Sequence, residues 1–105
     1  MSWIQKEIIL PPFNRGYHII TDLIINELHE LKKINIGVIY IFIKHTSASL
    51  TINEAADPTV RKDFESHMNK MIPENAHYYQ HTMEGPDDMP AHLKSSILGS
   101  SLILP

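Results

Sequence analysis

The chain of 105 residues contains no cysteine and no hydrophobic run that approaches the roughly 20 residues needed to span a bilayer. Without cysteine it can form no disulfide, thiolate nucleophile, cysteine-ligated zinc site or iron–sulfur cluster. It also lacks the phosphate-binding P-loop, the GxGxxG turn and the GxSxG elbow. Nucleotide hydrolysis, dinucleotide redox chemistry and serine-esterase chemistry therefore have no support in the sequence.

Positive charge is also in short supply, with 9 Lys and Arg residues against 12 Asp and Glu and a formal charge of −3. This balance argues against a protein that coats nucleic acid with positive charge, so we expect no nucleic-acid partner. The first residues lack the basic segment and apolar block of a secretory signal. Since no segment suits a membrane either, the sequence predicts a cytoplasmic protein without a membrane partner.

Histidine is abundant by comparison. The chain has 7 histidines, and those at positions 45, 67, 77, 81 and 92 share one window with eight carboxylates. Histidine and carboxylate are the side chains most used for metal ligation and for proton transfer near neutral pH. Many such residues simply lie on the surface, so position and spacing must select the functional ones.

Hydrophobic periodicity and turn residues predict a single domain with an α+β fold. Asp57 and Pro58 have the residue types of a helix N-cap and a first helical position, and Gly99 is suited to end the third helix. Thr21 or Asp22 can cap the first helix, for which we expect about three turns. The expected strands cover residues 3–10, 38–43, 50–53 and 100–104, and the expected helices begin at 21, 58 and 89, with a loop over 74–88.

The run of large apolar side chains at residues 38–43 predicts a strand that is buried on both faces. Such a strand needs neighbours over both faces and along both edges, yet the chain stops soon after its last strand starts. We therefore expect a further C-terminal segment or a neighbouring subunit to cover the sheet, which favours an oligomer.

The first candidate site is the polar segment at residues 45–49, directly after this strand. A strand end holds such residues rigidly, which suits a functional site. His45 can ligate a metal or transfer protons, and the hydroxyl groups of the segment can bind an anion. The same residues also suit a plain turn in which Thr and Ser cap backbone groups. Nearby, Asp57 fits a helix cap better than catalysis, whereas Glu54 could orient a histidine of this site.

The second candidate site lies at residues 81–92. Asp88 and His92 are four positions apart, so on a helix they share one face. An imidazole paired with a carboxylate is the minimal unit of a divalent-metal or acid–base site, and a helix N-terminus also attracts phosphate. The alternative is that Asp87 and Asp88 cap the helix while His92 is solvated.

Three ordered motifs resemble the YjbQ-like family, whose members are often identified as secondary thiamine-phosphate synthases. They are KHTSASLTINE at residues 44–54, ADP at 56–58 with Val60, Arg61 and Asp63, and EGPDDMPAHLK at 84–94. The resemblance extends over nearly the whole chain. It implies an α+β fold with a mixed β-sheet and about three helices, and a homotrimer with one polar site near the subunit contacts.

The resemblance also implies roles for individual residues. His45, His81 and His92 match motif histidines of the family, and Glu54, Glu84 and Asp88 match its motif carboxylates. One departure is that members continue through a Gly-Thr-Trp-Gln segment and a final strand. The single domain of residues 1–105 lacks this segment, so we expect a C-terminally truncated member.

From these observations we expect a site for a small phosphorylated substrate and a divalent metal, zinc or magnesium. The expected reaction is metal-assisted coupling of a pyrimidine pyrophosphate with a thiazole phosphate. The alternatives are a metal-dependent hydrolase or lyase on another anion, and a non-enzymatic trimeric binding module. The expected catalytic residues are His45, Glu54, Asp88 and His92. The residues expected to bind substrate are Lys44, Thr46, Ser47, Ser49, Asn53 and Lys94. The expected metal ligands are His45, His81 and His92.

Overall fold

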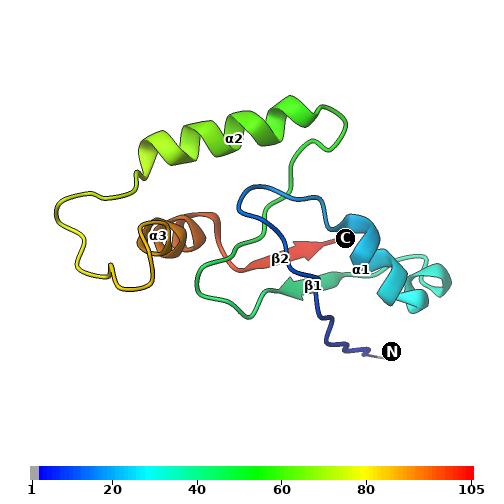
Figure 1. The fold of residues 1–105 in the computed structure, drawn as a ribbon. Helices are drawn as coiled ribbons and strands as arrows, with labels where there is room; N and C mark the ends of the chain where they lie inside the picture. Colours follow the sequence, from blue (N-terminus) through cyan, green and yellow to red (C-terminus); the bar gives the residue numbers. More distant parts are fainter. Residues whose placement is uncertain (1–2) are drawn as a thin grey trace.

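The computed structural model describes residues 3–105 as an α+β fold with three α-helices and a small antiparallel sheet, which is the predicted fold class (Figure 1). None of the helices in this part of the chain is long and apolar enough to cross a membrane. In chain order the elements are α1 (Thr21–Glu27), the 3₁₀ helix η1 (His29–Lys33), β1 (Ile39–Phe42), α2 (Pro58–Met71), α3 (Asp88–Leu98) and β2 (Ser101–Leu104).

The sheet pairs β1 with β2 in antiparallel register, from Ile39 opposite Leu104 to Phe42 opposite Ser101. Within residues 3–105 it has these two strands only, so it is antiparallel rather than mixed as expected. The predicted strands at 3–10 and 50–53 are wrong, because neither segment pairs with a neighbour. A strand forms only where an adjacent edge satisfies its backbone groups, and alternation in the sequence does not supply that edge.

The prediction that residues 38–43 are buried on both faces is wrong for the single chain. Burial alternates along β1, with Ile39 and Ile41 half-buried on one face. Tyr40 and Phe42 on the other face are 63% and 57% exposed. Because the described residues place no second layer over that face, the two-residue pleat leaves alternate side chains in solvent.

Local chemistry sets the start of α2 and the end of α3, as predicted. The Asp57 carboxylate accepts hydrogen bonds from the Thr59 N–H at 2.9 Å and from its hydroxyl at 2.7 Å, which lowers the pKa of Asp57. Pro58 then occupies the first position of α2. Gly99 ends α3 with a φ of +96°, in the region that favours glycine.

The first helix is shorter than expected. α1 has 7 residues and is followed by η1. The residue in the N-cap position is Ile20, with no side-chain cap, so the expected cap by Thr21 or Asp22 is wrong. At the other end the Leu28 N–H is shared between two carbonyls, those of Ile24 and Ile25, which is typical of a helix that tightens toward 3₁₀ geometry.

A small core attaches residues 45–50 to α3. The Ser95 hydroxyl donates to the Ala48 carbonyl at 2.7 Å, and the Leu50 N–H donates to the Gly99 carbonyl at 3.1 Å. Ser95 is only 8% exposed, so its bond is shielded from water. These contacts hold the polar segment after β1 against the helix that carries His92. The buried residues of the core are Leu50, Met68, Ile72, Pro90 and Ser95.

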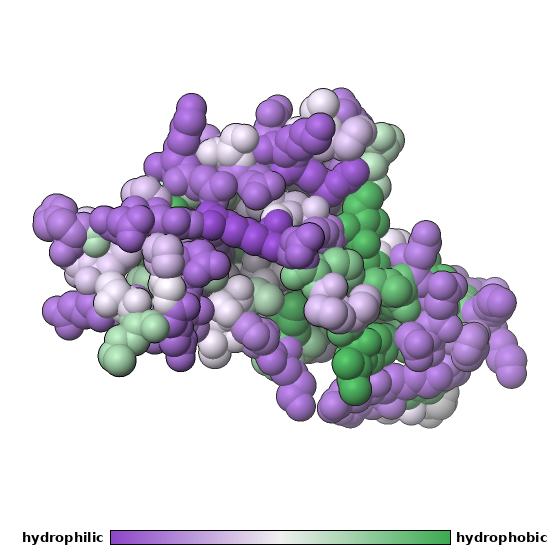
Figure 2. Space-filling model, viewed as in Figure 1, coloured by the Kyte–Doolittle hydropathy of each residue, from purple (hydrophilic) through white to green (hydrophobic). Residues whose placement is uncertain are grey.

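The chain exposes more surface than a compact monomer of its size. Its accessible surface is 8631 Å², about 2,600 Å² above the roughly 6,000 Å² expected. The radius of gyration is 16.2 Å, against about 13 Å for a compact domain of this length. In the view of Figure 2, hydrophobic side chains gather over the sheet and α1, whereas the region of α2 and α3 is mainly hydrophilic.

Candidate functional site

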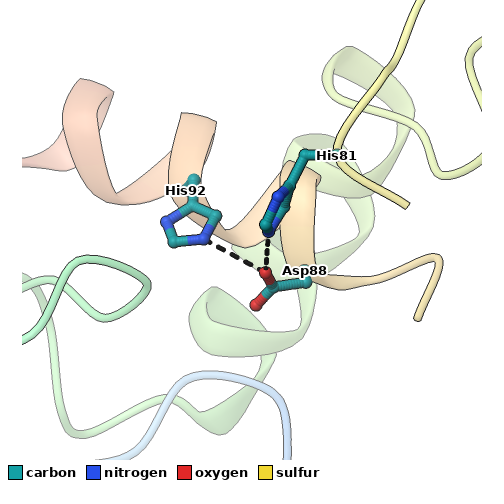
Figure 3. A group of neighbouring side chains, drawn as sticks. All are labelled: His81, Asp88 and His92. Atoms are coloured by element: carbon teal, nitrogen blue, oxygen red, sulfur yellow. Dashed lines mark hydrogen bonds and ion pairs between the residues drawn. The ribbon is translucent and has the colours of Figure 1, made fainter. Parts of the chain in front are cut away.

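Three side chains converge at the start of α3 (Figure 3). Asp88 Oδ2 lies 2.6 Å from His81 Nε2 and 3.1 Å from His92 Nε2. One nitrogen or oxygen atom from each residue lies within 4.8 Å of those of the other two. We call His81, Asp88 and His92 the candidate metal group.

The path of residues 81–92 explains this convergence. Asp88 is the first residue of α3 and His92 follows one turn later, so their side chains share a face. The preceding loop turns at Gly85, where φ is +106° and the N–H donates to the Thr82 carbonyl. This turn returns the chain so that His81 faces the first residue of α3 (Figure 3).

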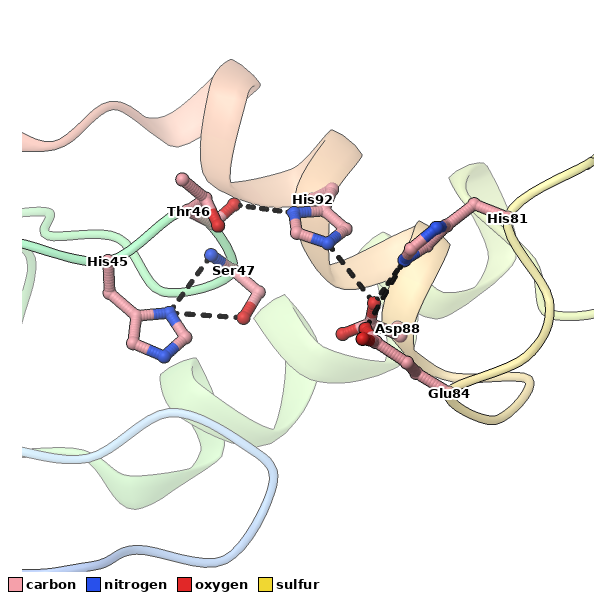
Figure 4. A network of polar contacts seen from close by, with 7 residues as sticks. All are labelled: His45, Thr46, Ser47, His81, Glu84, Asp88 and His92. Atoms are coloured by element: carbon pink, nitrogen blue, oxygen red, sulfur yellow. Dashed lines mark hydrogen bonds and ion pairs between the residues drawn. The ribbon is translucent and has the colours of Figure 1, made fainter.

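The partners of His92 fix its tautomer. Its Nδ1 lies 2.9 Å from the Thr46 carbonyl oxygen, which can only accept, so Nδ1 carries the proton (Figure 4). In the neutral imidazole this leaves a lone pair on Nε2, which faces the Asp88 carboxylate at 3.1 Å. Because the carboxylate is also an acceptor, the two atoms need a proton or a metal ion between them.

Asp88 also contacts His81, and the two side chains shift each other's pKa. The hydrogen bond to Asp88 is the largest cause of a raised pKa at His81, with smaller contributions from the charges of Asp88 and Glu84. The same bond lowers the pKa of Asp88. A metal ion at the candidate metal group would compete with protons for the imidazole nitrogens, because an imidazole ligates metals through a deprotonated nitrogen.

The donor set of the candidate metal group fits a zinc-like ion. Two imidazole nitrogens and one carboxylate oxygen suit zinc, whereas magnesium prefers oxygen ligands throughout. Three protein ligands leave a coordination position for water or substrate, as in catalytic zinc sites. The Thr46 carbonyl bonds the second ring nitrogen of His92, which is the usual support of a metal-ligating histidine.

His45 lies outside the candidate metal group. Its Nδ1 accepts a hydrogen bond from the Ser47 N–H at 3.0 Å and lies 3.1 Å from the Ser47 hydroxyl (Figure 4). Since a backbone N–H can only donate, neutral His45 carries its proton on Nε2, the opposite tautomer to His92. Within one chain, therefore, the expected convergence of three histidines brings together only His81 and His92, with Asp88 between them.

His45 instead lines an open hollow of about 560 Å³ at the end of β1. Lys44 and Thr46 line it too, and the Lys44 ammonium lies 3.6 Å from the carboxylate of Glu7, with both side chains exposed. An imidazole N–H, an ammonium and a hydroxyl are donors that suit an anion. The rest of the hollow is lined by Phe42, Ile43 and Ser100.

Other residues expected to bind substrate have structural contacts. Ser47 holds His45, and the Asn53 amide oxygen accepts from the Glu54 N–H at 2.8 Å, which stabilises its own turn. Ser49 is half-buried. Glu54 is exposed and, among residues 3–105, its carboxylate contacts no histidine, so the expected support of a histidine is not formed within the chain.

Lys94 belongs to a separate cluster between α3 and α2. Its ammonium donates to the Asn69 amide oxygen at 2.6 Å, and the same oxygen accepts from Arg15 at 3.0 Å. Arg15 also pairs with Glu74. Burial and then the charge of Arg15 lower the pKa of Lys94. The cluster braces the two helices, and Lys94 lines neither the hollow nor the candidate metal group.

One contribution to the site was not predicted from the sequence. The pairing of Asp88 with His92 was expected for a metal or acid–base site, with Asp88 given a catalytic role. The Thr46 backbone carbonyl, which orients His92, carries no signal in the residue type, because every residue has such a carbonyl.

Residues 6–105 match the family model described as UPF0047 protein YjbQ-like. The chain belongs to the YjbQ-like family. The UPF0047 protein YjbQ of Escherichia coli O157:H7 is 50% identical over 103 residues, which cover 98% of this chain and 74% of that relative. The UPF0047 protein YjbQ of Salmonella typhimurium strain LT2 is 52% identical with the same coverage.

Solved structures share the YjbQ-like fold. A conserved hypothetical protein of Thermus thermophilus matches with a TM-score of 0.73 and 34% identity, over 85% of this chain and 65% of that protein. A YjbQ/UPF0047 family protein of Clostridium acetobutylicum matches with a TM-score of 0.76 and 35% identity, over 90% of this chain and 70% of that protein. The chain thus spans less than two thirds of the Thermus protein, and none of these four relatives has a name that states an activity.

Proposed function

We propose that the chain holds one divalent metal ion through His81, Asp88 and His92 and acts on a small phosphorylated or otherwise anionic substrate. The observation that supports this most directly is that one carboxylate oxygen, Asp88 Oδ2, contacts two imidazole nitrogens, His81 Nε2 at 2.6 Å and His92 Nε2 at 3.1 Å. The Thr46 carbonyl, which accepts from the other ring nitrogen of His92, keeps Nε2 directed at the Asp88 carboxylate. The mixed nitrogen and oxygen donors favour zinc over magnesium.

When bound, the metal ion would neutralise charge that develops on the oxygens of a leaving phosphoryl or pyrophosphoryl group. The His45 N–H, the Lys44 ammonium and the Thr46 hydroxyl would bind and orient the anion in the hollow at the end of β1. Residues 45–47 belong to both parts, since Thr46 holds His92 and Ser47 holds His45. The turn at residues 45–47 therefore fixes the position of the hollow at the end of β1 relative to the candidate metal group.

The finer proposal is thiamine-phosphate synthesis, which joins a pyrimidine pyrophosphate to a thiazole phosphate and releases pyrophosphate. Its support is chemical: a departing pyrophosphate needs cationic help, which Lys44 and a metal ion supply. A hydrolase or lyase on another anion would use the same groups. A binding module would instead need a closed metal shell, so the three-ligand group favours an enzyme.

We also propose that the chain works as a homotrimer. The excess surface of about 2,600 Å² falls within the roughly 2,000–5,000 Å² buried by permanent subunit interfaces. Part of it is the apolar face formed by Tyr40, Phe42 and Ile103, whose side chains are between 57% and 66% exposed. An apolar face of this kind is typical of a surface that another subunit covers.

Zinc titration of the metal-stripped chain by calorimetry tests the proposed function. We expect one zinc ion per chain, and we expect His81→Ala to weaken binding by more than the roughly 10- to 100-fold typical of lost supporting contacts. His67→Ala, at an exposed histidine of α2, is the matched control and should bind zinc normally. Zinc binding that is absent, or that His81→Ala leaves unchanged, would contradict the proposal.

Pyrophosphate release then distinguishes the reactions. The zinc-loaded chain is given the pyrimidine pyrophosphate with and without the thiazole phosphate. Release that requires the thiazole phosphate supports thiamine-phosphate synthesis, whereas release without it supports a hydrolase or lyase. Tight zinc binding without either activity, on these or other phosphate esters, would contradict the proposal of an enzyme and would support a non-enzymatic binding module.

A further inference from the structure

A second hollow lies directly beside the candidate metal group and is mainly apolar. It is open to solvent and has a volume of about 400 Å³, within the range of small-molecule sites. His81 belongs to both features: its Nε2 contacts Asp88, while the residue also lines this hollow. The lining residues are Tyr78, Tyr79, Gln80, His81, Met89 and Leu93.

The geometry of α3 explains why the hollow and the candidate metal group are adjacent. Met89 and Leu93 each follow a residue of the group by one position, so α3 carries two parallel rows of side chains. One row is polar, Asp88 and His92, and the other is apolar, Met89 and Leu93. Neighbouring positions on a helix lie about 100° apart around its axis, so a molecule in the hollow can also reach the group.

The aromatic wall of the hollow is held in place before any ligand arrives. The Tyr79 hydroxyl donates to the Pro73 carbonyl at 3.0 Å, and the Tyr79 N–H donates to the Ala76 carbonyl at 3.0 Å. The ring of Tyr78 packs edge-on against that of Tyr79, with ring centroids 5.2 Å apart. Tyr78 nevertheless remains 68% exposed, which leaves much of a large aromatic ring free to contact a ligand.

We propose that this hollow binds the aromatic ring of a small ligand whose anionic group reaches the metal ion, an inference that rests on the proposed function. The walls provide apolar and aromatic surface, and His81 is the only ionisable side chain near neutral pH among the lining residues. Apart from His81, which the proposed function assigns to the metal ion, the lining residues carry no charge, and a planar ring can pack against Tyr78 and Leu93. The ligand class is a monocyclic aromatic compound that carries a phosphonate, phosphate or carboxylate.

The first arm of the test compares phenylphosphonate with methylphosphonate on the zinc-loaded chain by calorimetry. The two probes share the metal-binding group and differ in the ring. We expect phenylphosphonate to bind at least about tenfold more tightly, because the ring buries apolar surface. Tyr78→Ala and Leu93→Ala should remove this advantage and leave methylphosphonate affinity unchanged. Ile97→Ala, 60% exposed on the same helix and outside the hollow, should retain it.

The second arm follows the methyl signals of Met89 and Leu93 by NMR while benzyl alcohol is added to the metal-free chain. Saturable shifts that Tyr78→Ala abolishes would support a ring site without reference to metal. Their absence would overturn the inference, even where zinc and methylphosphonate bind as the proposed function requires. Ring binding without zinc binding would contradict the proposed function and the contact between the ligand's anionic group and the metal ion, while the ring site itself would stand. Shifts that follow protein dilution rather than benzyl alcohol would make the hollow a contact between copies of the chain and overturn the inference.

Discussion

The α2–α3 region of this molecule is organised by polar contacts within the chain, whereas the sheet region leaves an apolar face exposed. Around α3, polar groups pair within the chain: His92 contacts both Asp88 and Thr46, and Ser95 bonds to Ala48. Around the sheet and the segments before it, large apolar side chains stay in solvent. Val38 and Ile103 are 73% and 66% exposed, and Figure 2 shows apolar surface gathered over this region.

The difference indicates which part of the protein can act alone. The candidate metal group takes every ligand from residues 81–92, so one chain completes it. Within the described residues 3–105 the sheet has two strands and an uncovered apolar face, so further surface is needed to bury it. Substitutions around α3 should therefore change ligand binding, and substitutions on the sheet should change assembly.

The largest expected effect is that of His92→Ala on metal binding. Loss of one of three ligands should weaken zinc binding by at least about 100-fold, since even lost supporting contacts cost roughly 10- to 100-fold. Calorimetry measures the affinity, and the NMR signals of Tyr40 and Ile103 report whether the sheet stays intact. A loss of zinc affinity below tenfold would contradict metal ligation by His92. A disrupted sheet would contradict the proposed separation between the two regions.

The next effect concerns assembly. Ile103→Glu places a charge on the exposed apolar face, so we expect the mass measured by light scattering to fall from that of a trimer to that of one chain. Zinc affinity should change by less than about tenfold, because no ligand comes from the sheet. Ser96→Glu, exposed on α3, is the control and should stay trimeric. A wild-type chain that is monomeric at micromolar concentration would disprove the trimer.

A smaller effect tests the attachment between the two regions. Ser95→Ala removes the donor to the Ala48 carbonyl and leaves a shielded acceptor unpaired, which should lower the free energy of unfolding by about 1–3 kcal/mol. Ser96→Ala, one position along at an exposed site, should change it by no more than about 0.5 kcal/mol. Urea unfolding measures both. Equal effects of the two variants would show that this bond does not hold residues 45–50 in place.

The smallest expected effect on stability is that of Lys44→Met. Its contact with Glu7 spans 3.6 Å between exposed side chains, so its loss should change the free energy of unfolding by less than about 0.5 kcal/mol. Inorganic phosphate should nevertheless bind severalfold more weakly, because the hollow loses its ammonium group. Lys62→Met, on the exposed surface of α2, serves as the control in the same titration. Unchanged phosphate affinity would remove Lys44 from the anion site.

The parts of the fold that were predictable depend on local chemistry. Asp57 and Pro58 start α2, and Gly99 ends α3, because a cap, a fixed φ and a left-handed backbone are properties of single residues. Residues 3–10 and 50–53 were mispredicted as strands for the opposite reason. Their alternation is present in the sequence, but a strand also needs a neighbouring edge, which depends on the path of the rest of the chain.

The site divides in the same way. The shared face of Asp88 and His92 follows from their spacing on a helix and was predictable. His81 joins them only because the loop turns back at Gly85, and His45 is directed elsewhere by the backbone N–H of Ser47. Both outcomes depend on backbone geometry, which the residue types alone do not specify.

The short sequence span of the candidate metal group has an entropic consequence. His81 and Asp88 are 7 positions apart in the sequence, and Asp88 and His92 are 4 positions apart. By contrast, the contact between Thr46 and His92 closes a loop that spans 46 positions. The entropy lost on closing a loop grows with its length, so an ion would organise residues 81–92 at a lower entropic cost than the sheet demands. Metal capture can thus precede β-pairing during folding, and zinc added to a urea-denatured chain should order the start of α3 before β1 and β2 meet.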